Sequence, residues 1–238
     1  GNMWLRGNTK DRVADGAALC CPGGCALLAR TIRIANKGVK VEIVCLDLEG
    51  VLVPEIWIAV ADSTGIDALR ATTRDIPDYD ELMKRRLALM DENGLGLADV
   101  QSVVDKIGPL DGAVAFLDDL RPDFQVVILS DTFYEFALPL MRQLGWPTLF
   151  CHRLETGPGG AVTGYKLRMK DHKRQAVRAF HDLNFRVTAA GDSYNDTAML
   201  AEADRGILFQ APENVIEEFP QFPVVGTYGE LLRAIREN

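Results

Sequence analysis

The sequence lacks a long apolar run and an excess of positive charge, and each absence excludes a class of protein. No segment of its 238 residues has the length and purity of a transmembrane helix. Acidic residues outnumber basic ones by 34 to 26, and the net charge of −8 argues against a nucleic-acid backbone or an anionic membrane as the main partner. With 47% apolar and 25% charged residues, the chain has the composition of a soluble globular protein.

Cysteine is scarce as well, with five in the whole chain. Cys20, Cys21 and Cys25 are crowded together, but so few cysteines do not make a disulfide framework in a chain of this size. No second Cys/His pair follows at the spacing of a zinc site. Cys45 and Cys151 lie within apolar runs and are expected to be small core residues. This use of cysteine indicates a reducing, cytoplasmic environment.

Residues 1–40 differ in composition from the rest. Their Gly-Asn-Met start is typical of an expression remnant, and their apolar patch is interrupted by Arg30 and Arg33, which fits a signal peptide poorly. We expect the native domain to begin near Val41 and residues 1–40 to form a poorly ordered or non-native extension.

The segment VEIVCLDLEGVLV, from Val41 to Val53, has the clearest functional pattern. Its apolar run is typical of a buried strand in a parallel sheet, and it ends at Asp47, with Glu49 two residues later. Ligands of open α/β sheets bind beyond the carboxyl ends of the strands. Because side chains alternate along a strand, both carboxylates are expected on one side. Such a pair suits a divalent cation, or a nucleophile with an acid/base partner.

Residues 54–107 are expected to be entirely helical. Apolar side chains recur there at helical spacing, for example from Tyr79 to Met90. A helical block of this length is too long for an ordinary strand-to-helix crossover, so we interpret it as an inserted cap.

From residue 108 onward, strands and helices alternate. Strands are expected at 125–129, 148–154, 161–167, 186–190 and 206–209, and helices at 112–120, 133–144, 171–182, 197–203 and 228–235. The predicted fold class is therefore α/β: a doubly wound, Rossmann-like parallel sheet built from residues 41–53 and 108–238, with an all-helical cap domain at 54–107.

Three of the predicted strands end in polar clusters. These are Asp47 with Glu49, then Ser130 with Thr132, and then Asp192, Asn195 and Asp196. Because the carboxyl ends of parallel strands share one edge of the sheet, the clusters are expected to converge. The carboxylates are candidates to hold Mg²⁺, and the hydroxyl groups are candidates to hold phosphate oxygens. A lysine between Met169 and Arg174 could neutralise a nucleophile and a phosphoryl group.

In this order, the motifs DLEG, VVILSDT, Lys173 and GDSYND resemble those of the haloacid dehalogenase-like phosphatase superfamily. A helical cap directly after the first motif resembles the phosphoserine phosphatase branch. The segments CLDLEGVLVPEIW, ILSDTFYEF, AAGDSYNDT and FQAPENVIEEFP are similar to ThrH-type phosphoserine phosphatase/homoserine phosphotransferases. The resemblance extends from about Val41 to the end of the chain.

This resemblance implies a catalytic role for each motif. Asp47 would be the nucleophile that forms an aspartyl-phosphate, and Glu49 the general acid and then the general base. A carboxylate oxygen of Asp47, the backbone carbonyl of Glu49 and Asp192 would bind the Mg²⁺ cofactor. Ser130 and Lys173 would hold the phosphoryl oxygens.

The resemblance also implies supporting and substrate-binding residues. Asp196 and Asn195 would orient the metal ligands and Lys173. Lys170 remains an alternative to Lys173, because both lie near the start of the same predicted helix. The remaining candidates for the substrate pocket are Glu55, Arg86, Asp131 and Thr132, with Tyr79 and Arg85 as further possibilities.

Glu55 and Arg86 match the family residues that grip the ammonium and carboxylate groups of phosphoserine. The register of the cap arginine stays open between Arg86 and Arg85. The implied partners are O-phospho-L-serine and L-homoserine, with neither nucleic acid nor membrane, and a homodimer is compatible with the sequence.

The sequence departs from most phosphatases of the superfamily at Glu49, where they have Asp. The extra methylene changes the reach of the acid/base group, which bears on whether water or a bound alcohol is activated. Two alternative functions, which do not depend on this departure, also remain open. One is the same fold and mechanism acting on another small phosphomonoester, and the other is a non-catalytic phospho-acceptor module.

Overall fold

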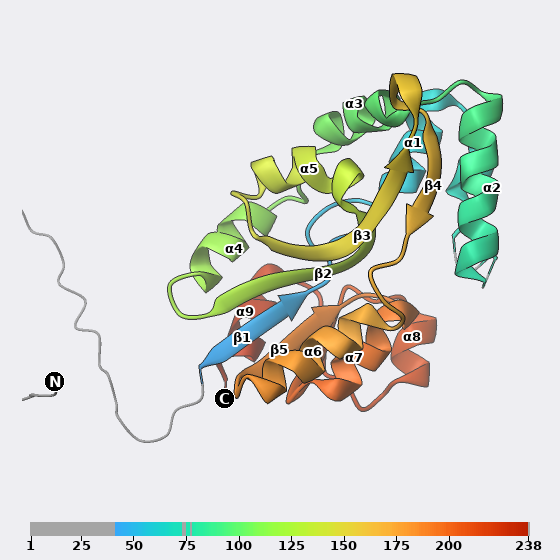
Figure 1. Ribbon diagram of the computed structural model, residues 1–238. Coiled ribbons are helices and arrows are strands. Elements are labelled where there is room, and N and C mark those ends of the chain that lie inside the picture. The colour runs from blue at the N-terminus through green and yellow to red at the C-terminus, as the bar shows by residue number, and fades with distance from the viewer. Residues whose placement is uncertain (1–40, 73–74, 77, 238) are drawn as a thin grey trace, which may run out of the picture. The chain divides into compact units, whose positions relative to one another are not determined.

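The computed structural model describes residues 41–72, 75–76 and 78–237, so the expectation for residues 1–40 lies outside the described residues. A seven-stranded sheet of order β4-β3-β2-β1-β5-β6-β7 forms its centre (Figure 1). The strands are β1 (Glu42–Leu46), β2 (Gln125–Phe133), β3 (Thr148–Thr156), β4 (Val162–Lys166), β5 (Arg186–Gly191), β6 (Arg205–Phe209) and β7 (Val224–Val225). All neighbouring strands are parallel except β3 and β4, which form the antiparallel hairpin predicted around the GPGG turn.

The helices are α1 (Ile56–Thr64), α2 (Tyr79–Glu92), α3 (Leu97–Ile107), α4 (Ala113–Leu120), α5 (Tyr134–Gln143), α6 (His172–Asp182), α7 (Thr197–Glu202), α8 (Glu213–Glu218) and α9 (Tyr228–Arg236). The sequence pattern did not predict α8 or β7, because both are too short to show a period. In the part of the chain that the structure describes, no helix is long and apolar enough to cross a membrane.

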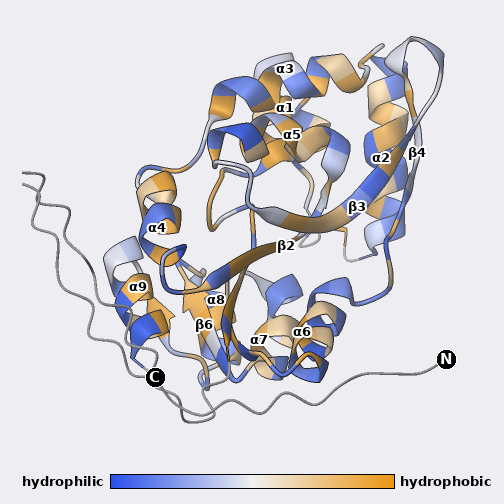
Figure 2. Cartoon of the chain, turned by 60° about the vertical axis from the view of Figure 1, so that its left-hand side comes forward, coloured by the Kyte–Doolittle hydropathy of each residue, from blue (hydrophilic) through white to orange (hydrophobic). Residues whose placement is uncertain are grey.

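Both faces of the sheet are covered, which confirms the doubly wound architecture. Along β1, Val44 and Leu46 belong to a core cluster shared with α4, α5 and α9, whereas Ile43 and Cys45 belong to a second cluster shared with α6 and α7. Such two-sided burial explains why β1 is an uninterrupted apolar run. Figure 2 shows the same arrangement, with apolar strands inside and polar helix surfaces outside.

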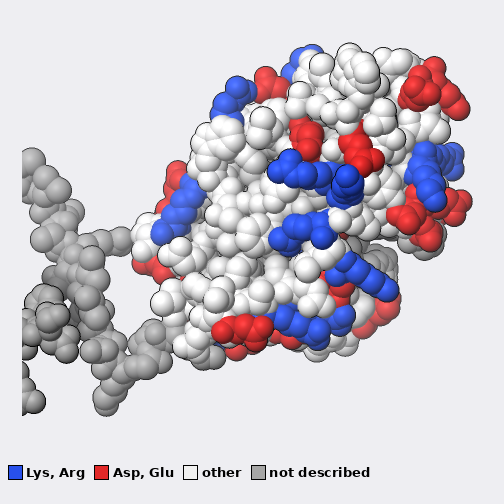
Figure 3. Space-filling view, viewed as in Figure 1, with Lys and Arg blue, Asp and Glu red and all other residues white. Residues whose placement is uncertain are grey.

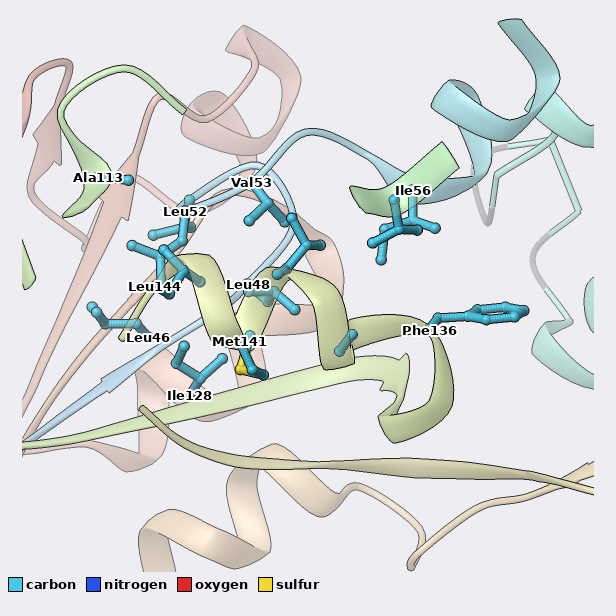
Figure 4. Close-up of a cluster of buried hydrophobic side chains, with 14 of the residues drawn as sticks. Leu46, Leu48, Leu52, Val53, Ile56, Ala113, Ile128, Phe136, Met141 and Leu144 are labelled. Atoms are coloured by element: carbon cyan, nitrogen blue, oxygen red, sulfur yellow. The ribbon is translucent and has the colours of Figure 1, made fainter. Parts of the chain in front are cut away.

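The larger cluster fixes the chain where it leaves β1. Figure 4 shows the side chains that gather there around α5: Leu46, Leu48, Leu52, Val53, Ile56, Ile128, Phe136, Met141 and Leu144. Burying an aliphatic side chain of this kind stabilises the fold by about 1.5–3 kcal/mol. The segment that follows Asp47 is therefore anchored on its apolar side, while its polar side chains face the sheet edge.

The described part of residues 54–107 contains α1, α2 and α3 and no strand, as the sequence predicts. The α2 helix begins after Asp78, whose side chain accepts a hydrogen bond from the backbone N–H of Glu81 at 2.9 Å. Its buried face includes Leu82, Met83 and Arg86. In Figure 1, α2 lies beside β4, and the rings of Tyr79 and Tyr165 meet edge to face at 6.1 Å.

Candidate active site

The polar ends of three adjacent strands meet in one cavity. The sheet order places β1 between β2 and β5, so their carboxyl ends lie side by side, and the N–H of Asp47 donates to the carbonyl of Ala190 at 3.0 Å. The cavity has a volume of about 600 Å³. Most of the residues predicted from the sequence line it: Asp47, Glu49, Glu55, Tyr79, Arg86, Ser130, Asp131, Thr132, Lys170, Lys173, Asp192 and Asn195. Asp196 lies buried behind the wall.

Lys173 is the charged centre of the site. Its buried ammonium group lies 2.9 Å from Asp47, 2.8 Å from Asp196 and 3.3 Å from Asp131. Burial opposes its positive charge, but the three carboxylates hold the pKa of Lys173 well above its ordinary value. The alternative candidate, Lys170, is exposed at the cavity wall. The geometry therefore places Lys173, and not Lys170, against the predicted nucleophile.

Asp47 is almost completely buried at the end of β1. Burial and the charges of Asp196 and Asp192 raise its pKa well above the ordinary value, while Lys173 opposes the shift. The loop approaches Asp192 closely because Gly50 has a φ of 78° and no side chain. A Cβ at this position would lie 2.5 Å from a carboxylate oxygen of Asp192. The glycine of the DLEG motif is therefore a geometric requirement of the site.

The acidic groups outnumber the nearby cation, which fits a divalent metal ion. Oxygen atoms of Asp47, Asp192 and Asp196 all lie within 4.8 Å of one another. Asp196 is already engaged, because it accepts from Lys173 and from the backbone N–H groups of Asp192 and Ser193. Burial, Asp196 and Glu55 raise the pKa of Asp192 to about 7, as expected for a carboxylate without sufficient positive charge. Oxygen donors of this type are the ligands that Mg²⁺ takes.

Glu49 has the properties of a proton donor. Its carboxylate accepts a hydrogen bond from the N–H of Ile56, at the start of α1, at 2.8 Å. Burial and the neighbouring Glu55 raise the pKa of Glu49 to about 8, against the opposing effects of Ile56 and Arg86. A carboxyl group that is still protonated near neutral pH can supply a proton to a leaving group.

The cap side of the cavity carries a buried arginine. Arg86 stacks over Trp57, with its guanidinium carbon 4.6 Å from the ring centroid, and donates to the carbonyl of Ala71 at 2.8 Å. Its Nε has no hydrogen-bond partner among the described residues. Burial lowers the pKa of Arg86 to about 10, so the group stays cationic. Arg85 is exposed and does not line the cavity, so the helix register selects Arg86.

The hydroxyl groups of the second motif also line the cavity. Ser130 and Thr132 are buried, and the Ser130 Oγ accepts from the N–H of Thr132 at 3.2 Å. Asn195 donates to the carboxylate of Asp131 at 2.8 Å, and the Tyr79 hydroxyl donates to the backbone carbonyl of Asp131 at 3.0 Å. The cavity thus contains buried hydroxyl groups, an ammonium group and a guanidinium group.

This set of motifs also matches a known family. The profile described as haloacid dehalogenase-like hydrolase matches residues 41–204. The chain belongs to this hydrolase family. The match confirms the superfamily inferred from the motifs, and it covers β1, the helical block and the ends of β2 and β5.

Two curated relatives of this hydrolase are 69% identical to it. One is a protein of Pseudomonas aeruginosa named phosphoserine phosphatase ThrH, which aligns over 81% of this chain and 94% of its own length. The other is a protein of Pseudomonas syringae pv. tomato named phosphoserine phosphatase, which aligns over 80% of this chain and 81% of its own length.

Solved structures share the fold of the hydrolase at lower identity. A phosphoserine phosphatase described as a phospho-aspartyl intermediate analogue superimposes with a TM-score of 0.68 at 19% identity, over 82% of this chain and 99% of its own. A substrate-bound phosphoserine phosphatase gives a TM-score of 0.68 at 17% identity, over the same shares of the two chains. At this identity the likeness shows the fold.

Two histidines of the hydrolase lie in the cavity although the sequence pattern did not identify them as candidates. His152 of β3 and His172 at the start of α6 are buried, line the cavity and contact Asp131. His172 directly precedes Lys173 in the sequence, and this position next to a predicted catalytic residue could have identified it as a candidate. No feature of the sequence indicated His152, because only the pairing of β2 with β3 brings this residue to the site, where it lies opposite Phe133.

Proposed function

We propose that this hydrolase is a Mg²⁺-dependent phosphoserine phosphatase that works through an aspartyl-phosphate on Asp47 and also transfers the phosphoryl group to homoserine. The observation that carries the proposal is the buried contact of Asp47 with Lys173 at 2.9 Å, in a cavity that also holds Arg86 and Glu55. The two relatives named phosphoserine phosphatase, at 69% identity, support the choice of substrate.

Substrate binding follows from the charged and hydroxyl groups that line the cavity. Ser130 and Lys173 would hold the phosphoryl oxygens, with Thr132 beside them. Arg86 would bind the carboxylate and Glu55 the ammonium group of phosphoserine, because an amino acid head group requires an opposite-charge pair. On the face that Figure 3 shows, Lys and Arg side chains are interspersed with Asp and Glu side chains, so attraction of a phosphate ester depends on the charged groups inside the cavity.

The chemistry is a double displacement. Asp47 attacks phosphorus, the bond from phosphorus to the serine oxygen breaks, and protonated Glu49 gives its proton to that oxygen. Glu49 then takes a proton from water or from the homoserine hydroxyl group, whose oxygen attacks the aspartyl-phosphate and releases Asp47. Mg²⁺, held by Asp47, Asp192 and the Glu49 carbonyl, would supply charge stabilisation to the phosphoryl oxygens.

A second candidate keeps this mechanism but acts on another small phosphomonoester. The cavity volume of about 600 Å³ favours it, because that volume is in the range of sites for ligands larger than phosphoserine. The same spare volume accommodates an acceptor amino acid beside the phosphoserine. A non-catalytic phospho-acceptor module is disfavoured by the proton donor Glu49 beside Asp47.

The direct test is phosphate release from O-phosphoserine with Mg²⁺, with and without homoserine. We expect release without homoserine, and phosphohomoserine formation at the expense of free phosphate when homoserine is present. Release that homoserine does not change would limit the protein to hydrolysis. Absence of turnover of phosphoserine, together with turnover of other monoesters, would support the second candidate.

Replacing Arg86 with Ala should raise KM for phosphoserine by roughly 10–100-fold, because a hydrogen bond to a charged group contributes about 1.5–3 kcal/mol. The exposed neighbour provides the matched control, and Arg85→Ala should leave KM within about twofold. Steady-state kinetics with p-nitrophenyl phosphate complete the test, since this ester has no amino acid head group and its KM should not change. A larger effect of Arg85→Ala than of Arg86→Ala would overturn the assignment.

The stability of the metal-free protein should fall as the pH rises from about 4 to 8. The pKa values of Glu49 and Asp192 are raised to about 8 and about 7, so the folded state holds protons that the unfolded state releases at lower pH. The folded state loses these protons only as the pH rises through the raised pKa values of Glu49 and Asp192. The free energy of unfolding should therefore decrease progressively between about pH 4 and pH 8.

Thermal unfolding, measured in EDTA and in Mg²⁺ at several pH values, tests whether stability decreases with rising pH. Mg²⁺ at a hundredfold excess over its dissociation constant stabilises by about 2.7 kcal/mol, which is roughly 5–10 °C for a protein of this size. The gain should be larger at pH 8 than at pH 5, because protons compete with the cation. Asp192→Asn should flatten the pH dependence in EDTA, and an unchanged dependence in this variant would contradict the assignment.

A further inference from the structure

The proposed mechanism leaves two buried histidines without a role. His152 of β3 and His172 of α6 lie against each other, with ring centroids 4.4 Å apart. Both point an Nε2 atom at the same carboxylate oxygen of Asp131, at 3.6 Å for His152 and 3.0 Å for His172. Only about 3% of each histidine is exposed. Three elements distant in sequence thus meet at the side chain of Asp131.

The proton positions in this cluster follow from its other hydrogen bonds. The Nδ1 atom of His152 accepts from the backbone N–H of Arg168 at 3.1 Å, so its proton is on Nε2 and faces Asp131. His172 also presents Nε2 to the carboxylate, while its Nδ1 has no hydrogen-bond partner among the described residues. Burial lowers the pKa of His172, which favours the neutral ring. His172 therefore donates one N–H to Asp131, and the N–H of His152 faces the same oxygen at 3.6 Å, beyond hydrogen-bond distance.

The second carboxylate oxygen of Asp131 faces the reaction centre. It lies 3.3 Å from the ammonium of Lys173 and accepts from the amide of Asn195 at 2.8 Å. Lys173 in turn contacts Asp47 at 2.9 Å. One carboxylate oxygen of Asp131 is therefore hydrogen-bonded to His172 and faces His152, and the other contacts the lysine next to the nucleophile.

We propose that His152 and His172 are positioning residues, which fix the Asp131 carboxylate so that it aims Lys173 and Asn195 at the phosphoryl group. This inference rests on the proposed role of Lys173 in phosphoryl transfer. It also changes the expected role of Asp131: with donors on both oxygens, its carboxylate orients cations and amides and does not itself bind the substrate. A carboxylate facing the phosphate would repel it unless donors of this kind neutralised it.

A metal ion is the competing explanation, because ligand atoms of Asp131, His152 and His172 lie within 4.8 Å of one another. The Lys173 ammonium disfavours a metal ion at this cluster. One oxygen of the Asp131 carboxylate already lies 3.3 Å from this positive charge, and a metal ion on the other oxygen would be repelled by it. The short contact between His172 and Asp131 is a complete hydrogen bond without an ion.

The test compares His172→Phe, which removes the donor, with His172→Gln, whose amide can present an N–H at the position of Nε2. We expect His172→Phe to lower kcat/KM by about 10–100-fold, the usual effect of losing a partner that orients a reacting group. His172→Gln should recover activity to within about threefold of the wild type. The loss should be equal for phosphoserine and p-nitrophenyl phosphate, because the network acts on the phosphoryl end.

A double-mutant cycle separates positioning from general damage to the fold. In a Lys173→Met background, adding His172→Phe should cost less than threefold, because its effect passes through the lysine. His181→Phe is the matched control, since His181 pairs with Asp204 at 2.9 Å near the far end of the same helix. It should leave kcat/KM unchanged.

Three outcomes would overturn the proposal: full activity of His172→Phe, no recovery in His172→Gln, or an undiminished loss in the Lys173→Met background. If His172→Phe does not fold, Asp131→Asn replaces it in the same cycle with the same expected loss. The proposed substrate is tested separately. Wild-type protein that cleaves p-nitrophenyl phosphate but not phosphoserine would refute that substrate, while the ratios between variants would still test the positioning role.

Discussion

Asp47→Asn should abolish phosphate release, with a fall in kcat on the order of 10⁴-fold or more, the scale seen when a covalent nucleophile is removed. The amide has nearly the same shape as the carboxylate, so the substrate cavity should persist. It cannot form an acyl phosphate, because an amide oxygen is a far weaker nucleophile than a carboxylate and would leave a charged nitrogen species.

Two measurements distinguish loss of the nucleophile from loss of the fold. Acid quenching of the wild-type protein during turnover of radiolabelled phosphoserine should leave label on the chain, and the same quench of Asp47→Asn should not. Asp111→Asn, an exposed change outside the site, serves as the control and should behave as wild type. Labelled protein or steady phosphate release in Asp47→Asn would place the covalent step on another residue.

The parts of the site that lie on or next to strand ends could be predicted from the sequence. The apolar run before Asp47 indicated a buried strand, and the shared edge of a parallel sheet indicated that Ser130 and Asp192 lie near it. The fold class and the family were both confirmed. These inferences succeed because strand direction and residue alternation are local properties of the chain.

The sequence left two choices open, between Arg85 and Arg86 and between Lys170 and Lys173. Both depend on the packing of a helix, which a single sequence does not specify. Arg86 is buried and Arg85 exposed because the apolar face of α2 sets the rotation of the helix. Lys173 is inside because α6 begins at His172, after Asp171 with a φ of 54°, so Lys170 lies before the first turn. These differences of one to three residues are below the precision with which a periodic pattern locates a helix end.

Lys173→Met should cost both activity and stability. Methionine keeps the length of the side chain and removes its charge, so kcat/KM should fall by at least about 10²–10³-fold, the usual cost of removing one group that stabilises transition-state charge. Breaking a buried ion pair by removing one partner destabilises by about 3–5 kcal/mol. The figure applies here because both Lys173 and Asp196 are almost fully buried.

The pH dependence of this variant is the sharper test of the charge argument. Without the ammonium, Asp47 and Asp196 lose the only cation that contacts both among the described residues. The pKa of Asp47, which burial already raises, should therefore rise further, and protonation of this carboxyl should offset part of the lost stability. The deficit in the free energy of unfolding, measured by urea denaturation in EDTA, should therefore be larger at pH 8 than at pH 5. Mg²⁺ should recover more stability in the variant than in the wild type, because it supplies the missing positive charge. Lys106→Met, an exposed lysine of α3 that does not line the cavity, should change neither stability nor kcat/KM by more than about twofold. An equal deficit at both pH values would mean that Lys173 contributes through packing alone and that the carboxylate cluster does not depend on its charge.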